Sequence, residues 1–168
     1  MQFYSTNRKT SPVSLREAVV RGLATDRGLF MPEVIRRFPP AFYQNMKEMT
    51  LREISFVVAE AFFGENVEAG KLKEIVDETL NFDIPLVQVA DNRYSLELFH
   101  GPTLAFKDVG ARFMARLLAY FNKQEGERQV NVLVATSGDT GSAVANGFLD
   151  VSGVKVFVLY PQGKVSEI

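Results

Sequence analysis

The carboxyl-terminal half of the sequence contains a pattern that few folds can satisfy. A β-branched apolar run, Val130 to Ala135, stops abruptly at a loop rich in glycine and hydroxyl residues. A short helix is predicted from Ala143 to Leu149, and a second apolar run extends from Val154 to Leu159. Strand, crossover helix and strand in this order are typical of a right-handed βαβ unit with parallel strands. The sequence therefore predicts a mixed α/β fold.

The loop after the first predicted strand has the composition of an anion-binding turn. Residues 137–142 read Ser-Gly-Asp-Thr-Gly-Ser, at the edge where parallel sheets bind ligands. Glycines let backbone N–H groups approach an anion closely, and the hydroxyls of Ser137, Thr140 and Ser142 add donors. Such loops also carry Ser, Gly and Asp merely for turning and capping, and Asp139 is equally a candidate cap for a helix over residues 140–149. The composition of the loop therefore predicts a binding site for a carboxylate or a phosphate.

One lysine occupies the start of a predicted helix. Lys107 follows a Gly101-Pro102 breaker and precedes apolar residues that recur every four positions from Val109 to Phe121. The positive end of the helix dipole disfavours an ammonium there, and Leu104 and Phe106, predicted to pack beside it, would add desolvation. Both effects predict a pKa below the usual value of about 10.4. Such an amine is a nucleophile suited to imine formation with a carbonyl, including that of pyridoxal phosphate. The alternative is an ordinary solvated surface charge.

Composition removes several classes of function. The chain has no cysteine and one histidine, His100, which excludes disulfides, thiolate chemistry and a multi-histidine metal centre. The net charge is −1 with no strongly basic window, so neither nucleic acid nor a membrane surface is an expected partner. No apolar run approaches the roughly 20 residues that span a bilayer, and the first residues lack a secretory signal. We therefore expect a cytoplasmic protein without a metal.

Residues 1–82 are predicted to form a mainly helical amino-terminal domain. Ser14–Glu17 and Thr50–Glu53 have capping-box patterns, and each is followed by a helical segment. A further amphipathic helix is expected from about Glu68 to Leu80, with its charged residues in solvent. No chemistry is indicated in residues 33–82.

From Ile84 the apolar period changes to two, around an Asp91-Asn92 pair that predicts a β-hairpin turn. We place a domain boundary near Asp83, so that residues 83–168 form an α/β domain. That domain is expected to be incomplete, because two parallel strands cannot make a sheet covered on both faces.

Three separated stretches resemble the threonine synthase family of pyridoxal-phosphate enzymes. Residues 97–108, Glu-Leu-Phe-His-Gly-Pro-Thr-Leu-Ala-Phe-Lys-Asp, are similar to its cofactor-lysine signature. Residues 135–143, Ala-Thr-Ser-Gly-Asp-Thr-Gly-Ser-Ala, are similar to its substrate and cofactor loop. The family's amino-terminal signature is similar to residues 4–6 and to the stretch that extends from residues 14–18 through residues 28–32. The resemblance implies fold type II, like the tryptophan synthase β chain: a helical domain followed by the start of a three-layer, mostly parallel-sheet domain that binds pyridoxal phosphate. It covers the amino-terminal part of the family only.

The resemblance also implies an activity for the parent enzyme. O-phospho-L-homoserine and water are converted to L-threonine and phosphate, the last step of threonine biosynthesis. Lys107 would be the Schiff-base residue and the proton carrier, and Ser137, Gly138, Asp139 and Thr140 would bind cofactor and substrate.

Ser142 and His100 are further candidates for substrate binding by the same resemblance, although a histidine before Gly-Pro is more often a loop hydrogen-bonder. Asp108 is predicted to cap the helix after Lys107, and Arg112 to form a surface ion pair. The oligomeric state implied is a monomer or a homodimer.

Alternative functions remain at this point. Another fold type II enzyme, such as a serine or threonine dehydratase or a cysteine synthase, would use the same cofactor with a different lysine signature. An anion-binding α/β domain would need a P-loop or Gly-x-Gly-x-x-Gly motif, and the sequence contains neither. A non-catalytic interaction domain is the third alternative. The cofactor's phosphate loop and the hydroxyl residue facing its pyridine nitrogen are not found in this chain, which leaves open whether the fragment alone is active.

Overall fold

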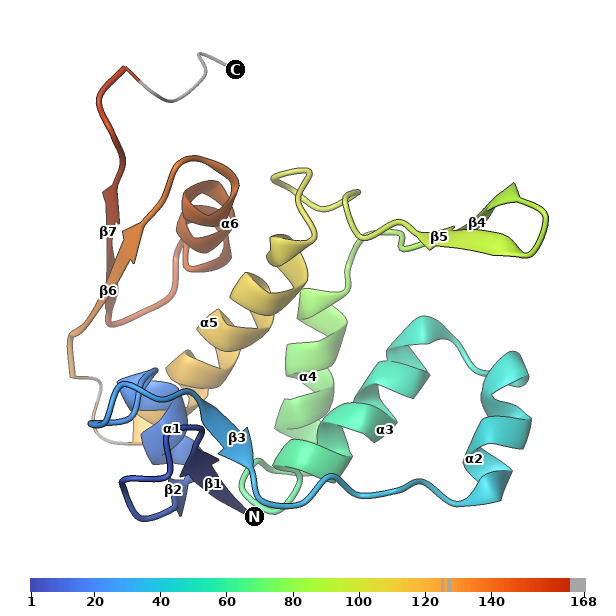
Figure 1. Cartoon of the computed structure of the whole chain (residues 1–168), viewed down its shortest axis with the longest axis horizontal. Coiled ribbons are helices and arrows are strands. Elements are labelled where there is room, and N and C mark those ends of the chain that lie inside the picture. Colours follow the sequence, from blue (N-terminus) through green and yellow to red (C-terminus); the bar gives the residue numbers. More distant parts are fainter. Residues whose placement is uncertain (125, 127, 164–168) are drawn as a thin grey trace. The chain divides into compact units, whose positions relative to one another are not determined.

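The computed structural model describes residues 1–124, 126 and 128–163. It contains two compact units, Met1–Asp77 and the residues from Glu78 onward, and each is described by itself. Figure 1 follows the chain in colour through both units. Helices and a parallel pair of strands confirm the predicted mixed α/β class. The three-layer arrangement and the domain boundary near Asp83 stay predictions.

The first unit begins with a three-stranded antiparallel sheet. Its strands are β1 (Gln2–Ser5), β2 (Val13–Ser14) and β3 (Phe30–Pro32), in the order β2-β1-β3. Phe3 lies opposite Val13 on one side and opposite Pro32 on the other. The pairing with β3 joins residues far apart in the sequence, so the description of residues 1–82 as mainly helical is incomplete.

A hydrogen-bond network joins this sheet to the turn before β3. The hydroxyl of Ser5, which is fully buried, donates to Asp26 Oδ1 at 2.6 Å. The backbone N–H groups of Gly28 and Lys9 donate to the same carboxylate at 2.9 and 3.0 Å. A side chain at position 28 would overlap Ser5 Oγ, so glycine is required there. The hydrogen bond from Ser5, followed by those from Gly28 and Lys9, holds the pKa of Asp26 below its usual value, although partial burial opposes the shift.

Helical segments form most of the remainder of the first unit. They are α1 (Leu15–Arg21), α2 (Pro40–Asn45), the 3₁₀ helix η1 (Met46–Glu48), α3 (Leu51–Phe63) and α4 (Ala69–Thr79), whose last turn passes into the second unit. The capping box predicted at Thr50 is confirmed: the Glu53 N–H donates to Thr50 Oγ1 at 3.3 Å, and the Thr50 N–H donates to Glu53 Oε2 at 2.7 Å. At α1, Ser14 accepts the Glu17 N–H at 3.2 Å. These local caps place the helix starts where the sequence predicts them.

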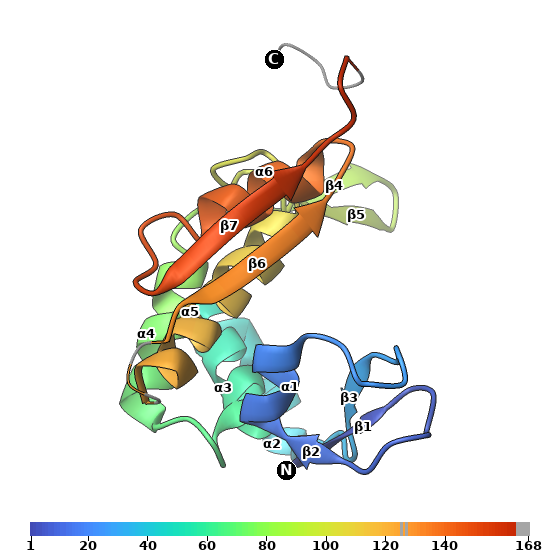
Figure 2. The ribbon, with the colours of Figure 1, turned by 90° about the vertical axis from the view of Figure 1, so that its left-hand side faces the viewer.

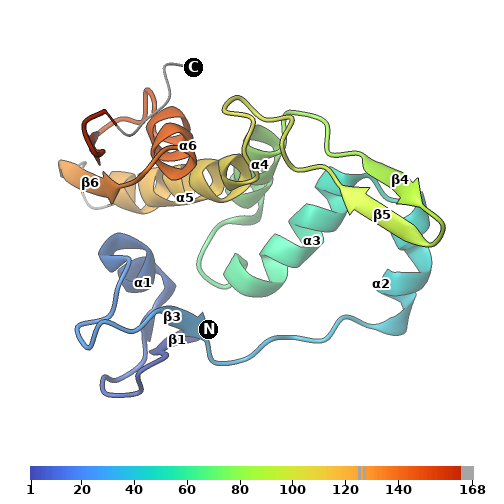
Figure 3. The same cartoon turned by 45° about the horizontal axis from the view of Figure 1, so that its top comes forward.

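The second unit opens with the predicted hairpin. Strands β4 (Leu86–Ala90) and β5 (Arg93–Leu96) pair antiparallel around a turn in which Asn92 has φ 56°. Asparagine tolerates this left-handed conformation better than most residues, which is why the Asp91-Asn92 pair predicts the turn correctly. Figures 1 and 3 show the hairpin well away from α6, and all of β4 is exposed.

The βαβ unit follows the long helix α5 (Lys107–Gln124) and confirms the predicted strands. Strands β6 (Val130–Ala135) and β7 (Val154–Leu159) pair parallel in register from Val130 opposite Val154 to Ala135 opposite Leu159. The connecting helix α6 (Asp139–Gly147) begins earlier than predicted, at Asp139 rather than Ala143. The reason is a hydroxyl outside the helix: Thr136 Oγ1 accepts the N–H groups of Gly138 and Gly141, both at 3.1 Å.

Helices α5 and α6 cover one face of the β6–β7 sheet (Figure 2). Alternate residues of both strands, such as Val132 and Val158, are half-buried, and Val158 packs beside Gly141 of α6. On the opposite face Leu133 is 70% exposed and Leu159 is 59% exposed. The pair of strands therefore has one covered and one bare apolar face.

A glycine sets how closely α6 approaches α5. A Cβ atom added at Gly147 would lie 3.0, 3.1 and 3.2 Å from the carbonyl carbon, carbonyl oxygen and Cβ of Ala111. Most of these neighbours are backbone atoms of a helix, so they cannot move aside independently. The two helices therefore touch through a glycine and an alanine, which lets their backbones approach closely.

Among the described residues, no helix combines the length and apolar character needed to cross a lipid bilayer. The same residues contain no cluster of three or more His, Asp or Glu side chains arranged to hold a metal ion.

Asp26→Asn should destabilise the protein at neutral pH and have less effect in acid. The carboxylate has a lowered pKa in the folded state, so its contribution is complete above the unfolded value of about 3.9 and is lost as the pH falls through the folded value. Urea unfolding of both proteins across the acid range measures the difference. Asp77→Asn, which removes only an exposed pair with Lys73, is the control and should change stability little. A difference between wild type and Asp26→Asn that persists undiminished in strong acid would contradict the assignment.

Gly147→Ala should destabilise the protein by about 1–3 kcal/mol, because the added methyl group must separate two packed helices. Gly110→Ala is the matched control on α5, since a Cβ there meets nothing within 4 Å. Alanine is the better helix former by up to about 1 kcal/mol, so this control should be neutral or stabilising. Thermal unfolding of both variants tests the pair. Equal effects of the two substitutions would show that the close approach of α5 and α6 is not what Gly147 provides.

Candidate functional site

A pocket of about 460 Å³ lies between the first turns of α5 and α6. Its lining residues are Leu98, Phe106, Lys107, Val109, Gly110, Ala111, Thr140, Ala143 and Val144. Lys107, Gly110 and Ala111 recur at helical spacing along α5, as Thr140, Ala143 and Val144 do along α6. The pocket therefore brings the predicted lysine and one residue of the predicted anion loop together.

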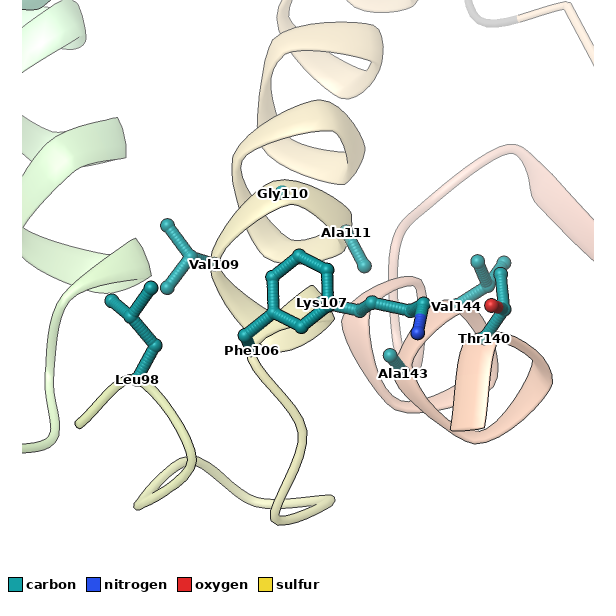
Figure 4. A pocket seen from close by; sticks show the side chains of 9 residues that line it. All are labelled: Leu98, Phe106, Lys107, Val109, Gly110, Ala111, Thr140, Ala143 and Val144. Atoms are coloured by element: carbon teal, nitrogen blue, oxygen red, sulfur yellow. The ribbon is translucent and has the colours of Figure 1, made fainter. Parts of the chain in front are cut away.

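Lys107 is the first residue of α5, as the loop-to-helix pattern predicts. Its side chain extends toward α6, where Thr140 and Val144 are found (Figure 4). The ammonium nitrogen lies 4.9 Å from the centroid of the Phe106 ring. Of the described residues that line the pocket, Lys107 alone has an ionisable side chain, and it makes no ion pair within the part of the chain that the structure describes. The amine is thus unengaged by a carboxylate and faces nearly apolar walls.

The apolar surroundings of Lys107 differ from those predicted. Phe106, predicted to pack in the core, is 61% exposed, and Leu104 is 77% exposed. Both precede the helix, in a loop whose backbone turns at Leu104 with φ 55° and so directs these side chains outward. Phe106 still lies beside the amine and lines the pocket, together with small and branched residues of the helices, chiefly Ala111, Ala143 and Val144.

Asp108 does not cap α5 as predicted. It is fully buried, and its carboxylate accepts hydrogen bonds from the Thr103 N–H at 2.9 Å and the Thr103 hydroxyl at 2.6 Å. The bonds therefore hold the loop before the helix rather than the first N–H groups of the helix itself. Sequence reasoning missed this partner because a short acidic residue near a helix start is usually read as a cap.

The anion loop lies at the carboxyl end of β6, as predicted. Since Thr136 takes the N–H groups of Gly138 and Gly141, those of Ser137, Asp139 and Thr140 have no hydrogen-bond partner among the residues described. Free donors at the start of a helix favour an oxygen anion. Thr140 lines the pocket with Lys107, whereas Ser137, Gly138, Asp139 and Ser142 are outside its lining.

The capping interpretation of Asp139 is wrong. Asp139 is the first residue of α6, and the capping position is occupied by Gly138 without a side-chain bond. Thr136, two residues before Gly138, provides the hydroxyl that a cap would provide, which is visible in the sequence only as one more hydroxyl residue in the loop. A binding role for Asp139 stays a prediction.

His100 lies in a different pocket from Lys107. Its Nε2 atom is 2.7 Å from Glu97 Oε2, and it lines a hollow of about 470 Å³ with Asn81, Phe82, Asp83 and Pro85. The contact with Glu97 agrees with the alternative reading of a histidine that bonds within its own loop. Substrate binding by His100 stays a prediction.

Among the described residues Arg112 forms no surface ion pair, contrary to expectation. Its guanidinium donates to the carbonyl oxygens of Thr79 at 3.2 Å and Glu78 at 2.6 Å, and to Asn81 Oδ1 at 2.8 Å. Partial burial, followed by the neighbouring charge of Arg116, lowers the pKa of Arg112 from its usual value, while the attraction of Asp108 and Glu78 opposes the shift. Arg112 thus binds the carbonyl groups of the last two residues of α4, both of which belong to the second unit.

Comparisons with known proteins match this chain along its full length. The family described as "Threonine synthase N terminus" matches residues 2–80. A threonine synthase from Serratia marcescens is 42% identical over 168 residues, which is 100% of this chain and 38% of that protein.

Solved structures of threonine synthases also match this chain. A crystal structure of threonine synthase from Brucella melitensis, described as bound to PLP, superimposes with a TM-score of 0.91 at 36% identity, over 99% of this chain and 37% of that one. The threonine synthase structure from Escherichia coli gives a TM-score of 0.88 at 40% identity, over 99% of this chain and 38% of that one. Over its whole length the chain is therefore similar to the amino-terminal part of threonine synthases, and it spans about 38% of the length of the relatives it matches.

Proposed function

We propose that the protein containing this chain is a threonine synthase that uses pyridoxal 5′-phosphate, and that the chain supplies the lysine that holds the cofactor. The reaction converts O-phospho-L-homoserine and water to L-threonine and phosphate. The observation that carries the proposal is the shared pocket of Lys107 and Thr140, in which an unpaired amine faces the start of α6. Relatives named threonine synthase, one of them crystallised with PLP, support it.

The residues present fit the carbonyl end of such a cofactor. A volume of about 460 Å³ is within the range of small-molecule sites, roughly 300–1,000 Å³. Lys107 has no carboxylate partner among the described residues, so its amine is available for a covalent bond to a carbonyl carbon. Ala111, Ala143 and Val144 supply apolar surface on the side of the pocket where the amine lies.

Pyridoxal phosphate, when bound, supplies an electron sink for the α-carbon of an amino acid. The role of this chain's own residues is then to hold and move protons. Lys107 Nζ is the base and acid that takes and returns protons at successive carbons of the substrate. Phosphate leaves from the γ-carbon, and water adds at the β-carbon.

The start of α6 is proposed to bind the substrate carboxylate. The N–H groups of Ser137, Asp139 and Thr140 are unbonded within the described residues, and the helix dipole adds a partial positive charge at this end. Because Thr140 lines the pocket that contains Lys107, a carboxylate held there would keep the α-carbon near the amine.

Incubation with pyridoxal phosphate followed by borohydride reduction should leave a pyridoxyl group on Lys107. Peptide mass spectrometry identifies the modified residue. Lys107→Ala should remove the modification, because no other ionisable group among the described residues lines the pocket. Lys123→Ala, an exposed lysine at the far end of the same helix, is the matched control and should keep it. Wild-type protein that is modified on surface lysines but not on Lys107 would refute the cofactor assignment.

The reaction itself is tested by supplying O-phospho-L-homoserine to the natural protein that contains this sequence. Phosphate and L-threonine should appear in equal amounts, and Lys107→Ala should lower the rate by roughly a thousandfold or more, as the loss of acid–base catalysis alone does. A dehydratase would instead form a 2-oxo acid and ammonia from serine or threonine. Formation of those products without L-threonine would favour the alternative enzyme class.

A further inference from the structure

The residue after Lys107 is the most completely buried carboxylate in the described part of the chain, and the proposed reaction gives it no role. Asp108 is 0% exposed, although it lies in the first turn of α5 beside a pocket-lining lysine. Burial of a charged group is costly unless its bonding is satisfied. A buried acid next to the reactive amine therefore requires a physical reason.

We propose that Asp108 and Thr103 form a positioning pair that fixes the direction in which Lys107 enters the pocket. The inference rests on the proposed function for its consequence, but its geometry does not depend on a cofactor. Asp108 makes no contact with the reacting atoms in this scheme. It acts through the backbone of the residue before it.

Both oxygens of the carboxylate are bonded to one residue. Oδ2 accepts the Thr103 N–H at 2.9 Å, and Oδ1 accepts the Thr103 hydroxyl at 2.6 Å. Hydrogen bonds to a charged acceptor are about twice as strong as neutral ones. Two of them between residues five positions apart close the loop onto the first turn of α5.

The loop is shaped to receive this carboxylate. A Cβ atom at Gly101 would lie 2.5 Å from Asp108 Oδ2 and 3.0 Å from Phe82 Cζ, so only glycine leaves room for the carboxylate. The Leu104 N–H donates to the Gly101 carbonyl at 3.0 Å, in a turn that holds Leu104 at φ 55°. A non-glycine residue in this conformation costs energy and persists only where surrounding contacts enforce it. The bonds to Asp108 are the contacts that enforce it here.

The loop determines where α5 begins and hence where Lys107 points. The Asp108 N–H donates to the Ala105 carbonyl at 3.0 Å and the Val109 N–H to the Phe106 carbonyl at 3.3 Å, so the first turn is built on loop carbonyls. Successive helical residues diverge by about 100°. With Asp108 fixed inward, Lys107 is directed toward α6, as Figure 4 shows. Without the pair, the first turn can fray and the amine samples solvent.

Limited acetylation with acetic anhydride tests the proposal without any cofactor. The ratio of Lys107 to Lys123 modification, measured by peptide mass spectrometry, reports the environment of Lys107 against an exposed lysine on the same helix. Thr103→Val keeps the shape of the side chain but removes its hydroxyl, and Thr103→Ser restores the hydroxyl. We expect the ratio to rise in Thr103→Val and Asp108→Asn as the amine leaves the pocket, and to stay at the wild-type value in Thr103→Ser.

Asp26→Asn is the matched control, because Asp26 also accepts a buried hydroxyl, that of Ser5, at 2.6 Å. It belongs to the other compact unit and should leave the ratio unchanged. Thermal unfolding and circular dichroism of each variant show whether it is folded, and Thr103→Val is the milder change if Asp108→Asn is not. The positioning role would be overturned if folded Thr103→Val kept the wild-type ratio of Lys107 to Lys123 acetylation. It would also be overturned if this ratio rose as much in Asp26→Asn as in Thr103→Val.

A second readout uses the proposed cofactor. Pyridoxyl incorporation at Lys107 should fall roughly tenfold in Thr103→Val, the factor expected for loss of one charge-assisted hydrogen bond, and recover in Thr103→Ser. Wild-type protein that acquires no pyridoxyl group at Lys107 refutes the proposed function but leaves the acetylation result as the test of the pair. Full incorporation in Thr103→Val refutes the pair and leaves the proposed function standing.

Discussion

The pocket depends on the close contact between α5 and α6 at Ala111 and Gly147. Because these residues have almost no side chain, the two helices approach each other closely there, and the pocket that contains Lys107 and Thr140 lies beside this contact, with Ala111 in its lining. Larger residues at the contact would change the separation of every pair of groups along the two helices. The position of the amine relative to the anion loop is therefore set by packing several residues away from either.

A second constraint orients α6 on its strand. The Thr136 hydroxyl binds two N–H groups of the helix start, and Gly141 lets the helix pass directly over the Thr136 and Val158 side chains. The neighbouring N–H groups of Ser137, Asp139 and Thr140 stay unbonded within the described part of the chain, since one hydroxyl cannot reach all of them. The arrangement that stabilises the helix start thus also creates the donors that an anion would use.

Features encoded by short stretches of sequence could be predicted, and features that depend on distant partners could not. Strands β6 and β7, the Asn92 turn and the Thr50 cap follow from local periodicity and turn chemistry, and all are confirmed. The β1–β3 pairing joins segments separated by a helix, and no local pattern reveals it. Similarly, Arg112 finds its acceptors at residues 78–81, and the early start of α6 depends on a hydroxyl outside the helix.

For the candidate site, the resemblance and the helix-start pattern correctly bring Lys107 and Thr140 to one pocket. The surroundings of the lysine were predicted less well, because Phe106 and Leu104 lie in a loop whose direction is fixed by Asp108 and Gly101. The binding roles of four residues stay predictions, since such a role depends on a ligand rather than on the fold: Ser137, Asp139, Ser142 and His100.

The way Arg112 is bound has a consequence for the response of the protein to its solvent. The acceptors of its guanidinium are two carbonyl oxygens and an amide oxygen, none of which carries a net charge or gains a proton near neutrality. Dissolved ions weaken exposed ion pairs such as that of Lys73 and Asp77 by screening them. Arg112 itself forms no such pair among the described residues, whereas Arg116, one turn further along α5, pairs with Glu78. Concentrated salt should therefore leave the hydrogen bonds of Arg112 intact while it weakens the Arg116–Glu78 and Lys73–Asp77 pairs.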